Sequence, residues 1–84
     1  MNNSNLKDEQ ALEHLKSGIE GERGADNAIF SAGILSGMYL RPMKDEDREY
    51  RERIKSIIYE NIDSKIPFVA QVCLEFKKYI EKKD

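Results

Sequence analysis

The sequence predicts an all-α fold, a small four-helix bundle built around a fully apolar central helix at residues 27–40. This segment, NAIFSAGILSGMYL, carries no charge, although 36% of the chain is charged. On a helix with ~100° per residue, apolar side chains cover every side of it, and a helix that is apolar all round is expected to be buried all round. Its 14 residues are too few for a membrane span, which needs ~20.

Two glycines, Gly33 and Gly37, lie one turn apart in this segment. Each destabilises a helix by ~1 kcal/mol relative to alanine, but both let a neighbouring backbone approach closely. We therefore expect Gly33, Ser36 and Gly37 to be oligomer contacts, near a close helix crossing in a homodimer. A strand over IFSAGIL is the alternative, and its lack of alternation disfavours it.

Length and composition predict one helical domain, residues 6–84, after a disordered tail at residues 1–5. A chain of 84 residues hides only ~60–65% of its unfolded surface, so we expect at least a homodimer. The 14 basic and 16 acidic residues are interspersed and show no basic excess, so no nucleic-acid partner is expected. The single Cys73 and the absence of a signal-peptide pattern favour a cytoplasmic protein with no membrane partner.

The first helix is predicted at residues 6–20, with Ser4 or Asn5 as its cap. We expect it to end near Glu20 or Gly21. Its core-facing stripe consists of Ala11, Leu12, Leu15 and Ile19.

The connection GERGAD, residues 21–26, precedes the central helix, predicted at residues 26–40 with Asp26 or Asn27 as its cap. A glycine loop that leads into a helix can offer backbone N–H groups to an anion. Its candidate ligand-binding residues are Gly21, Arg23, Gly24 and Asn27. The alternative is a plain turn between two helices, because the loop lacks the spacing of a known phosphate-binding motif and Asp26 would repel an anion.

The third helix is predicted at residues 45–62, with Asp45 as its cap. Nine of the ten residues from Lys44 to Arg53 are charged, which is typical either of a solvated face or of a docking surface for a protein. Arginine is favoured at such contacts. The candidate partner-binding residues are Arg48, Arg51, Arg53 and the tyrosine predicted to be exposed, Tyr59.

The inner face of this helix is predicted to hold Tyr50, Ile54, Ile57 and Ile58. Asn61 falls within that stripe. It either fixes the register of helix packing or marks the helix end.

The last helix is predicted at residues 66–82, with Pro67 in its first turn and Ser64 as the best cap in the chain. Leu74 falls on its polar side and is an oligomer contact if a partner covers it. The apolar band consists of Phe68, Val69, Val72, Cys73, Phe76, Tyr79 and Ile80.

Residues able to carry catalysis are few. His14 and Cys73 form no recognisable dyad with an orienting group, and one histidine with one cysteine cannot complete a zinc site in a monomer. Cys73 lies among apolar residues and is expected to fill the core. We expect neither an enzyme nor a bound metal or cofactor.

The sequence therefore favours a non-enzymatic binding protein, an inhibitor or adaptor that acts by occupying a macromolecular partner, most simply a protein. The alternative is an oligomer that sequesters a small anionic ligand such as a nucleotide. In size and class the chain is like small phage proteins and inhibitor proteins, an analogy that assigns no residue a role.

Overall fold

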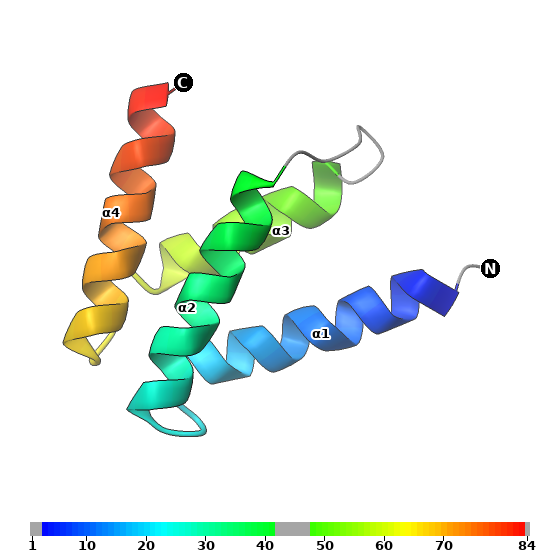
Figure 1. The fold of residues 1–84 in the computed structure, drawn as a ribbon, viewed down its shortest axis with the longest axis horizontal. Helices are drawn as coiled ribbons and strands as arrows, with labels where there is room; N and C mark the ends of the chain where they lie inside the picture. The colour runs from blue at the N-terminus through cyan, green and yellow to red at the C-terminus, as the bar shows by residue number, and fades with distance from the viewer. Residues whose placement is uncertain (1–2, 42–47, 84) are drawn as a thin grey trace.

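The computed structural model describes residues 3–41 and 48–83, and this part of the chain forms four α-helices and no strand (Figure 1). The helices are α1 at Asn3–Ile19, α2 at Ala25–Leu40, α3 at Arg48–Glu60 and α4 at Pro67–Lys83. The predicted all-α fold with four helices is confirmed. The predicted cap Asp45 lies outside the described residues.

The start of α1 differs from the prediction. The helix begins at Asn3, so residues 3–5 are helical, and Ser4 and Asn5 lie inside the helix instead of capping it. Its end follows the expected pattern, because the N–H of Glu22 donates to the Ser17 carbonyl and that of Gly21 to the Gly18 carbonyl. This pair of bonds, with φ 91° at Gly21, is the Schellman arrangement that glycine favours after a helix.

The starts of α2 and α4 are each set by one residue. Gly24, with φ 98°, occupies the N-cap of α2 and makes no side-chain capping bond, so the predicted caps Asp26 and Asn27 are wrong. α4 begins at Pro67, one residue after the predicted start, and Pro67 lies in the first turn as predicted, where a missing N–H is tolerated. Ser64 supports this start by accepting a hydrogen bond from the N–H of Ile66 at 3.1 Å.

Asn61 lies directly after the last residue of α3 and is 7% exposed. Its Nδ2 donates to the carbonyl oxygen of Ile57 at 2.8 Å. A carbonyl in the last turn of a helix has no partner within the helix, and the asparagine supplies one. The structure thus favours a role at the helix end over a role in register.

The helix α2 contacts α1, α3 and α4. In Figure 1, α1 and α3 lie on one side of it, and α4 runs beside it in the same direction. The fold measures 39 × 32 × 16 Å. Since packed helices lie 8–10 Å apart, the shortest dimension holds only two layers of helices.

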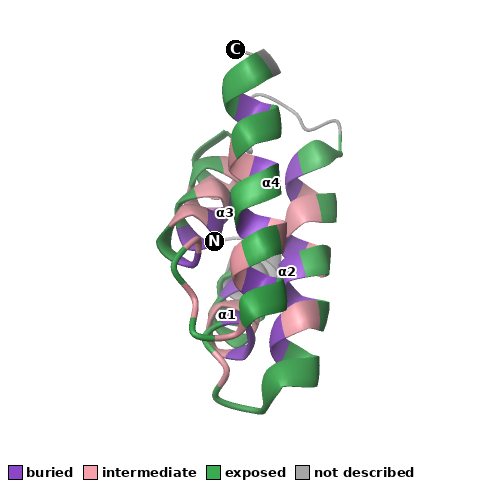
Figure 2. Ribbon diagram, turned by 90° about the vertical axis from the view of Figure 1, so that its left-hand side faces the viewer, coloured by how far each residue is buried: buried purple, intermediate pink, exposed green. Residues whose placement is uncertain are grey.

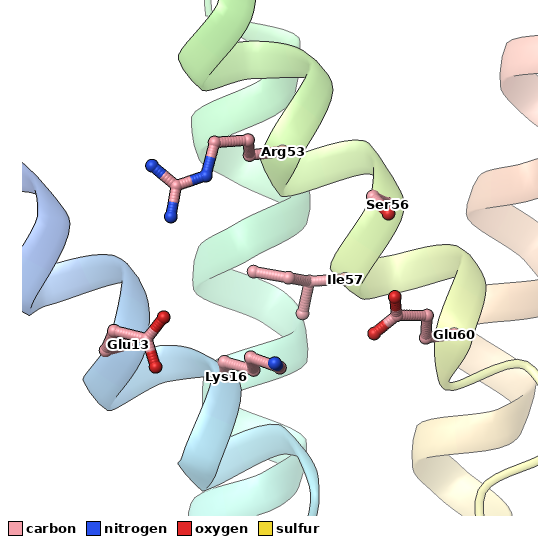
Figure 3. Close-up of a pocket in the computed structure, with 6 residues that line it drawn as sticks. All are labelled: Glu13, Lys16, Arg53, Ser56, Ile57 and Glu60. Atoms are coloured by element: carbon pink, nitrogen blue, oxygen red, sulfur yellow. The ribbon is translucent and has the colours of Figure 1, made fainter.

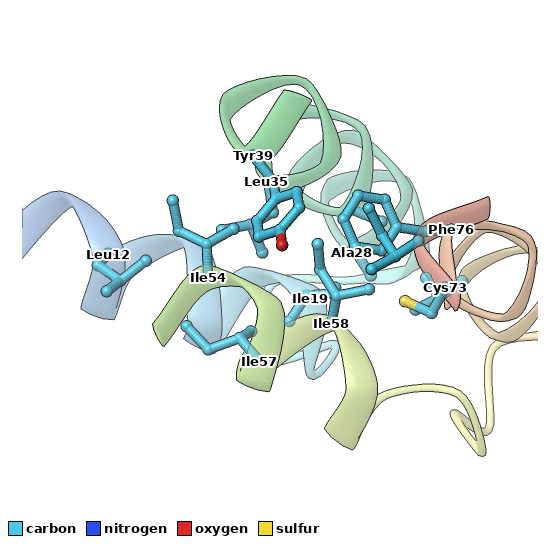
Figure 4. Close-up of a cluster of buried hydrophobic side chains, with 13 residues drawn as sticks. Leu12, Ile19, Ala28, Leu35, Tyr39, Ile54, Ile57, Ile58, Cys73 and Phe76 are labelled. Atoms are coloured by element: carbon cyan, nitrogen blue, oxygen red, sulfur yellow. The ribbon is translucent and has the colours of Figure 1, made fainter. Parts of the chain in front are cut away.

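The core lies between these layers (Figure 4). The rings of Tyr39 and Phe76 meet edge to face, with centroids 5.2 Å apart, and join α2 to α4. The predicted inner face of α3 is confirmed, because Ile54, Ile57 and Ile58 are all buried. The buried apolar residues are Leu12, Ile19, Ala28, Ala32, Leu35, Tyr39, Ile54, Ile57, Ile58, Val69, Cys73, Phe76 and Ile80.

The prediction that α2 is buried all round is wrong for the single chain. Its inner face is buried, but Phe30 is 68% exposed and Leu40 49%. Figure 2 shows the exposed residues along the side of α2 turned away from the other helices. The reason is geometric, because a fold two layers thick leaves every helix with an outer face.

The apolar band of α4 is narrower than predicted. Val69, Cys73, Phe76 and Ile80 are buried, whereas Phe68 is 65% exposed and Tyr79 is 50% exposed. Both exposed rings lie at the edge of the band, beyond the arc that α2 and α3 can cover.

Candidate functional site

The most distinctive feature of the molecular surface is its set of exposed apolar side chains. Within the described side chains, the large apolar residues that remain exposed all lie on α2 and α4. Apolar surface of this kind, when contiguous, marks interaction sites. The residues are Phe30 and Leu40 on α2, and Phe68, Leu74 and Tyr79 on α4.

Phe30 and Phe68 lie at the same end of the molecule. The contact between Tyr39 and Phe76 fixes the register of the two helices, which run in the same direction (Figure 1). Phe30 precedes Tyr39 by nine residues and Phe68 precedes Phe76 by eight. At ~1.5 Å per residue these are rises of ~13 Å and ~12 Å, so both exposed rings are found near the starts of α2 and α4.

The predicted oligomer contacts lie on two helices, with Gly33, Ser36 and Gly37 on α2 and Leu74 on α4. Gly33 and Gly37 are exposed on the outer side of α2, and a Cβ added at either would have no neighbour within 4 Å in residues 3–41 and 48–83. Ser36 is half-buried and donates to the Ala32 carbonyl oxygen at 2.8 Å. Leu74 lies on α4 and is 40% exposed. The two glycines are therefore not covered by any of the four described helices.

The predicted partner-binding residues do not share one surface. Arg51 lies against α2, where its Nε donates to the Tyr39 carbonyl oxygen at 2.9 Å and its guanidinium lies 4.3 Å from the centre of the Tyr39 ring. Arg53 points instead to α1 and pairs with Glu9. That hydrogen bond is the largest cause of a raised Arg53 pKa.

Tyr59 is half-buried instead of exposed, so that prediction is wrong. Lys55 of α3 and Lys77 of α4 lie over its ring, with Nζ atoms 5.6 Å and 5.7 Å from the centroid. Its ring therefore helps to hold α3 against α4. Arg48 is exposed and makes interactions of its own.

The loop between α1 and α2 holds Arg23 against α1. The Arg23 Nη1 donates to Ser17 Oγ at 2.8 Å, and Nη2 donates to the His14 carbonyl oxygen at 2.7 Å. The side chain of Asn27 donates to the carbonyl oxygen of Arg23 at 2.8 Å. With its guanidinium engaged in this way, the loop has the geometry of a helix–helix turn.

A cleft of about 170 Å³ opens between α1 and α3 (Figure 3). Its walls carry charges of both signs, which leaves no consistent preference for an anion or a cation. The lining residues are Glu13, Lys16, Arg53, Ser56, Ile57 and Glu60.

The two residues considered for catalysis lie in different environments. Cys73 is fully buried, and this burial raises the pKa of its thiol to about 11. His14 is exposed on α1. Within residues 3–41 and 48–83, no group of three or more His, Cys, Asp or Glu could hold a metal ion. No helix in this part of the chain is long and apolar enough to cross a bilayer.

Within the single chain, a close approach of two helices occurs at Gly18 of α1, and the crossing expected at Gly33, Ser36 and Gly37 between two copies stays a prediction. A Cβ added to Gly18 would lie 2.3 Å from Ser31 Oγ, so the absent side chain of Gly18 is what lets α1 approach α2 there. The sequence signal is a glycine on the same side of the first helix as Leu15 and Ile19.

The chain matches no known protein family, and no curated protein or solved structure is similar to it.

Proposed function

We propose that this chain is a non-enzymatic binding protein, an inhibitor or adaptor that acts by occupying a protein partner, and that it works as a homo-oligomer. The observation that carries the proposal is the distribution of exposed apolar side chains, which are confined to α2 and α4 among the described residues. Burying such side chains against another protein is favourable by ~25 cal/mol per Å² of apolar surface.

The outer face of α4 is the surface we assign to the partner. Phe68 and Leu74 are exposed on this face, on either side of the exposed Gln71, and exposed aromatic side chains such as Phe68 are typical of protein contacts. The charged start of α3 is less suited to the role, because Arg51 and Arg53 are engaged with neighbouring helices.

The small anionic ligand of the alternative hypothesis gains no support from the loop at residues 21–26. Arg23, the only cation of that loop, donates to two oxygens of α1. We therefore rank the protein partner first.

The proposal is tested by affinity purification from cells with the unmodified chain and with Phe68→Gln/Leu74→Gln. We expect a protein that co-purifies in stoichiometric amount with the unmodified chain and is lost with the double variant. The matched control is Ser56→Gln/Glu60→Gln on α3, which changes two exposed residues outside the apolar surface. Equal recovery with all three chains would contradict the assignment to α4.

A further inference from the structure

The outer face of α2 carries two glycines for which the single chain gives no packing reason. Among the described residues, a Cβ at Gly33 or Gly37 would meet nothing within 4 Å, and alanine would favour the helix at both positions. Glycine at helix positions that favour alanine, with no contact in the described part of the chain that requires it, indicates a role in contacts with another molecule.

The residues on this face follow heptad spacing. Asp26, Phe30, Gly33, Gly37 and Leu40 are separated by steps of four, three, four and three residues, and all five are exposed. Such spacing forms one continuous seam on a helix, which a second helix can follow at a crossing angle of ~20°.

The outer face of α2 is complementary, in charge and in side-chain size, to the same face of a second copy that runs in the opposite direction. Counted along the sequence, Asp26 and Arg41, which is the C-cap residue directly after α2, are equally far from the midpoint between Gly33 and Ile34, and the same is true of Phe30 and Gly37. An antiparallel second copy with its two-fold axis at this midpoint therefore places Asp26 opposite Arg41, and the large Phe30 opposite Gly37. The contact between Asp26 and Arg41 and the contact between Phe30 and Gly37 each occur twice in such a dimer, once on either side of the two-fold axis, as an isologous interface requires.

We propose that α2 binds the α2 of a second copy of this chain, antiparallel, with Asp26 facing the partner's Arg41 and Phe30 packed over the partner's Gly37. This inference rests on the homo-oligomer of the proposed function and specifies its geometry. The arrangement also brings the positive end of each α2 dipole beside the negative end of the other. It leaves the outer face of α4 free for the protein partner.

The interface is small. The seam from Asp26 to Arg41 is ~22 Å long and a helix is ~10 Å wide, which is well below the ~800 Å² per partner of a standard interface. We therefore expect a dimer that dissociates at micromolar concentrations, and sedimentation should span about 1 to 500 µM.

The test is a charge exchange followed by sedimentation equilibrium at low ionic strength. Asp26→Arg alone and Arg41→Glu alone should each weaken the dimer about tenfold, because each places like charges at both contacts. The double variant Asp26→Arg/Arg41→Glu should recover the original dissociation constant within threefold. Each change opposes the dipole of α2, so this recovery cannot come from better folding. Glu52→Arg, an exposed charge reversal on α3, is the matched control and should leave the dimer unchanged.

Gly37→Ala gives a second reading that does not depend on charge. It should raise the dissociation constant of the dimer at least tenfold, because the added methyl group occupies the space into which Phe30 of the second copy packs. The melting temperature of the dilute chain should stay the same or rise. A dimer that tolerates both Gly37→Ala and the single charge reversals would overturn the α2 geometry but keep the homo-oligomer. A chain that is monomeric up to 500 µM would overturn both, and the purification experiment with Phe68→Gln/Leu74→Gln would still test the protein partner separately.

Discussion

Arg51 is stacked on Tyr39, with its guanidinium 4.3 Å from the ring centre, and it also donates a hydrogen bond to the carbonyl oxygen of that residue. The Tyr39 ring meets Phe76 on α4 at the same time. One arginine of α3 thus holds the C-terminal turn of α2 at the point where α2 meets α4.

Replacing this arginine should destabilise the fold. Arg51→Lys keeps the charge but loses the planar stacking and the aimed Nε–H, and we expect a loss of about 1–2 kcal/mol in the free energy of unfolding. Urea denaturation monitored by circular dichroism measures it. Arg53→Lys on the same helix changes only an exposed pair with Glu9 and should stay within about 0.5 kcal/mol. Equal losses for the two variants would show that the Tyr39 contact contributes little.

Gly18→Ala should destabilise the chain even though alanine favours a helix. The new Cβ would lie 2.3 Å from Ser31 Oγ and 2.7 Å from Nη2 of Arg23, and relieving such overlap typically costs about 1–3 kcal/mol. Gly33→Ala, measured in the dilute chain, should instead raise stability by up to ~1 kcal/mol. A stabilised Gly18→Ala would mean that α1 and α2 do not approach as closely as described.

The buried thiol of Cys73 should make stability fall at alkaline pH. Its pKa rises from an ordinary value of 9.0 to about 11 in the folded chain because burial disfavours the thiolate. Between about pH 9 and pH 11 the unfolded chain therefore loses this proton while the folded chain keeps it, so the free energy of unfolding decreases as pH rises.

The measurement is the difference in the free energy of unfolding between the unmodified chain and Cys73→Ala, determined by urea titration at pH 8 and at pH 10.5. Subtracting the variant removes the contributions of lysines and tyrosines that titrate in the same window. The advantage of the unmodified chain should shrink at the higher pH. A constant difference would indicate that Cys73 is more accessible than the fold implies.

Arg23→Ala should affect stability and leave any response to nucleotides unchanged. The variant loses hydrogen bonds to Ser17 and to the His14 carbonyl, at an expected ~0.5–1.5 kcal/mol. Added nucleotides should shift the melting temperature of neither chain. A nucleotide-dependent shift that is present in the unmodified chain and absent from Arg23→Ala would revive the anionic-ligand hypothesis.

The helices could be predicted because their signals are local. The spacing of Ile54, Ile57 and Ile58, the proline at position 67 and the glycine at position 21 each act within one or two turns, and the structure agrees with all three.

The features that the sequence did not predict depend on which helix faces pack against each other. A segment without charges is equally consistent with burial on all sides and with an apolar outer face such as that of Phe30. Phe30 is exposed because the fold is only 16 Å thick, which leaves the outer face of α2 uncovered in the single chain. The pairing of Arg53 with Glu9, 44 residues earlier in the chain, likewise depends on how α3 lies against α1, and no spacing within α3 reveals it.

The central claim is that the chain acts by binding proteins and pairs with itself through α2. Native mass spectrometry of the protein purified from cells, sprayed at several concentrations into the high micromolar range, tests it most directly. We expect the 9.7 kDa chain to give way to a species of twice that mass as concentration rises, with no added small molecule. A 9.7 kDa species at every concentration would contradict the pairing, and a bound mass of a few hundred daltons would favour a small-ligand carrier instead.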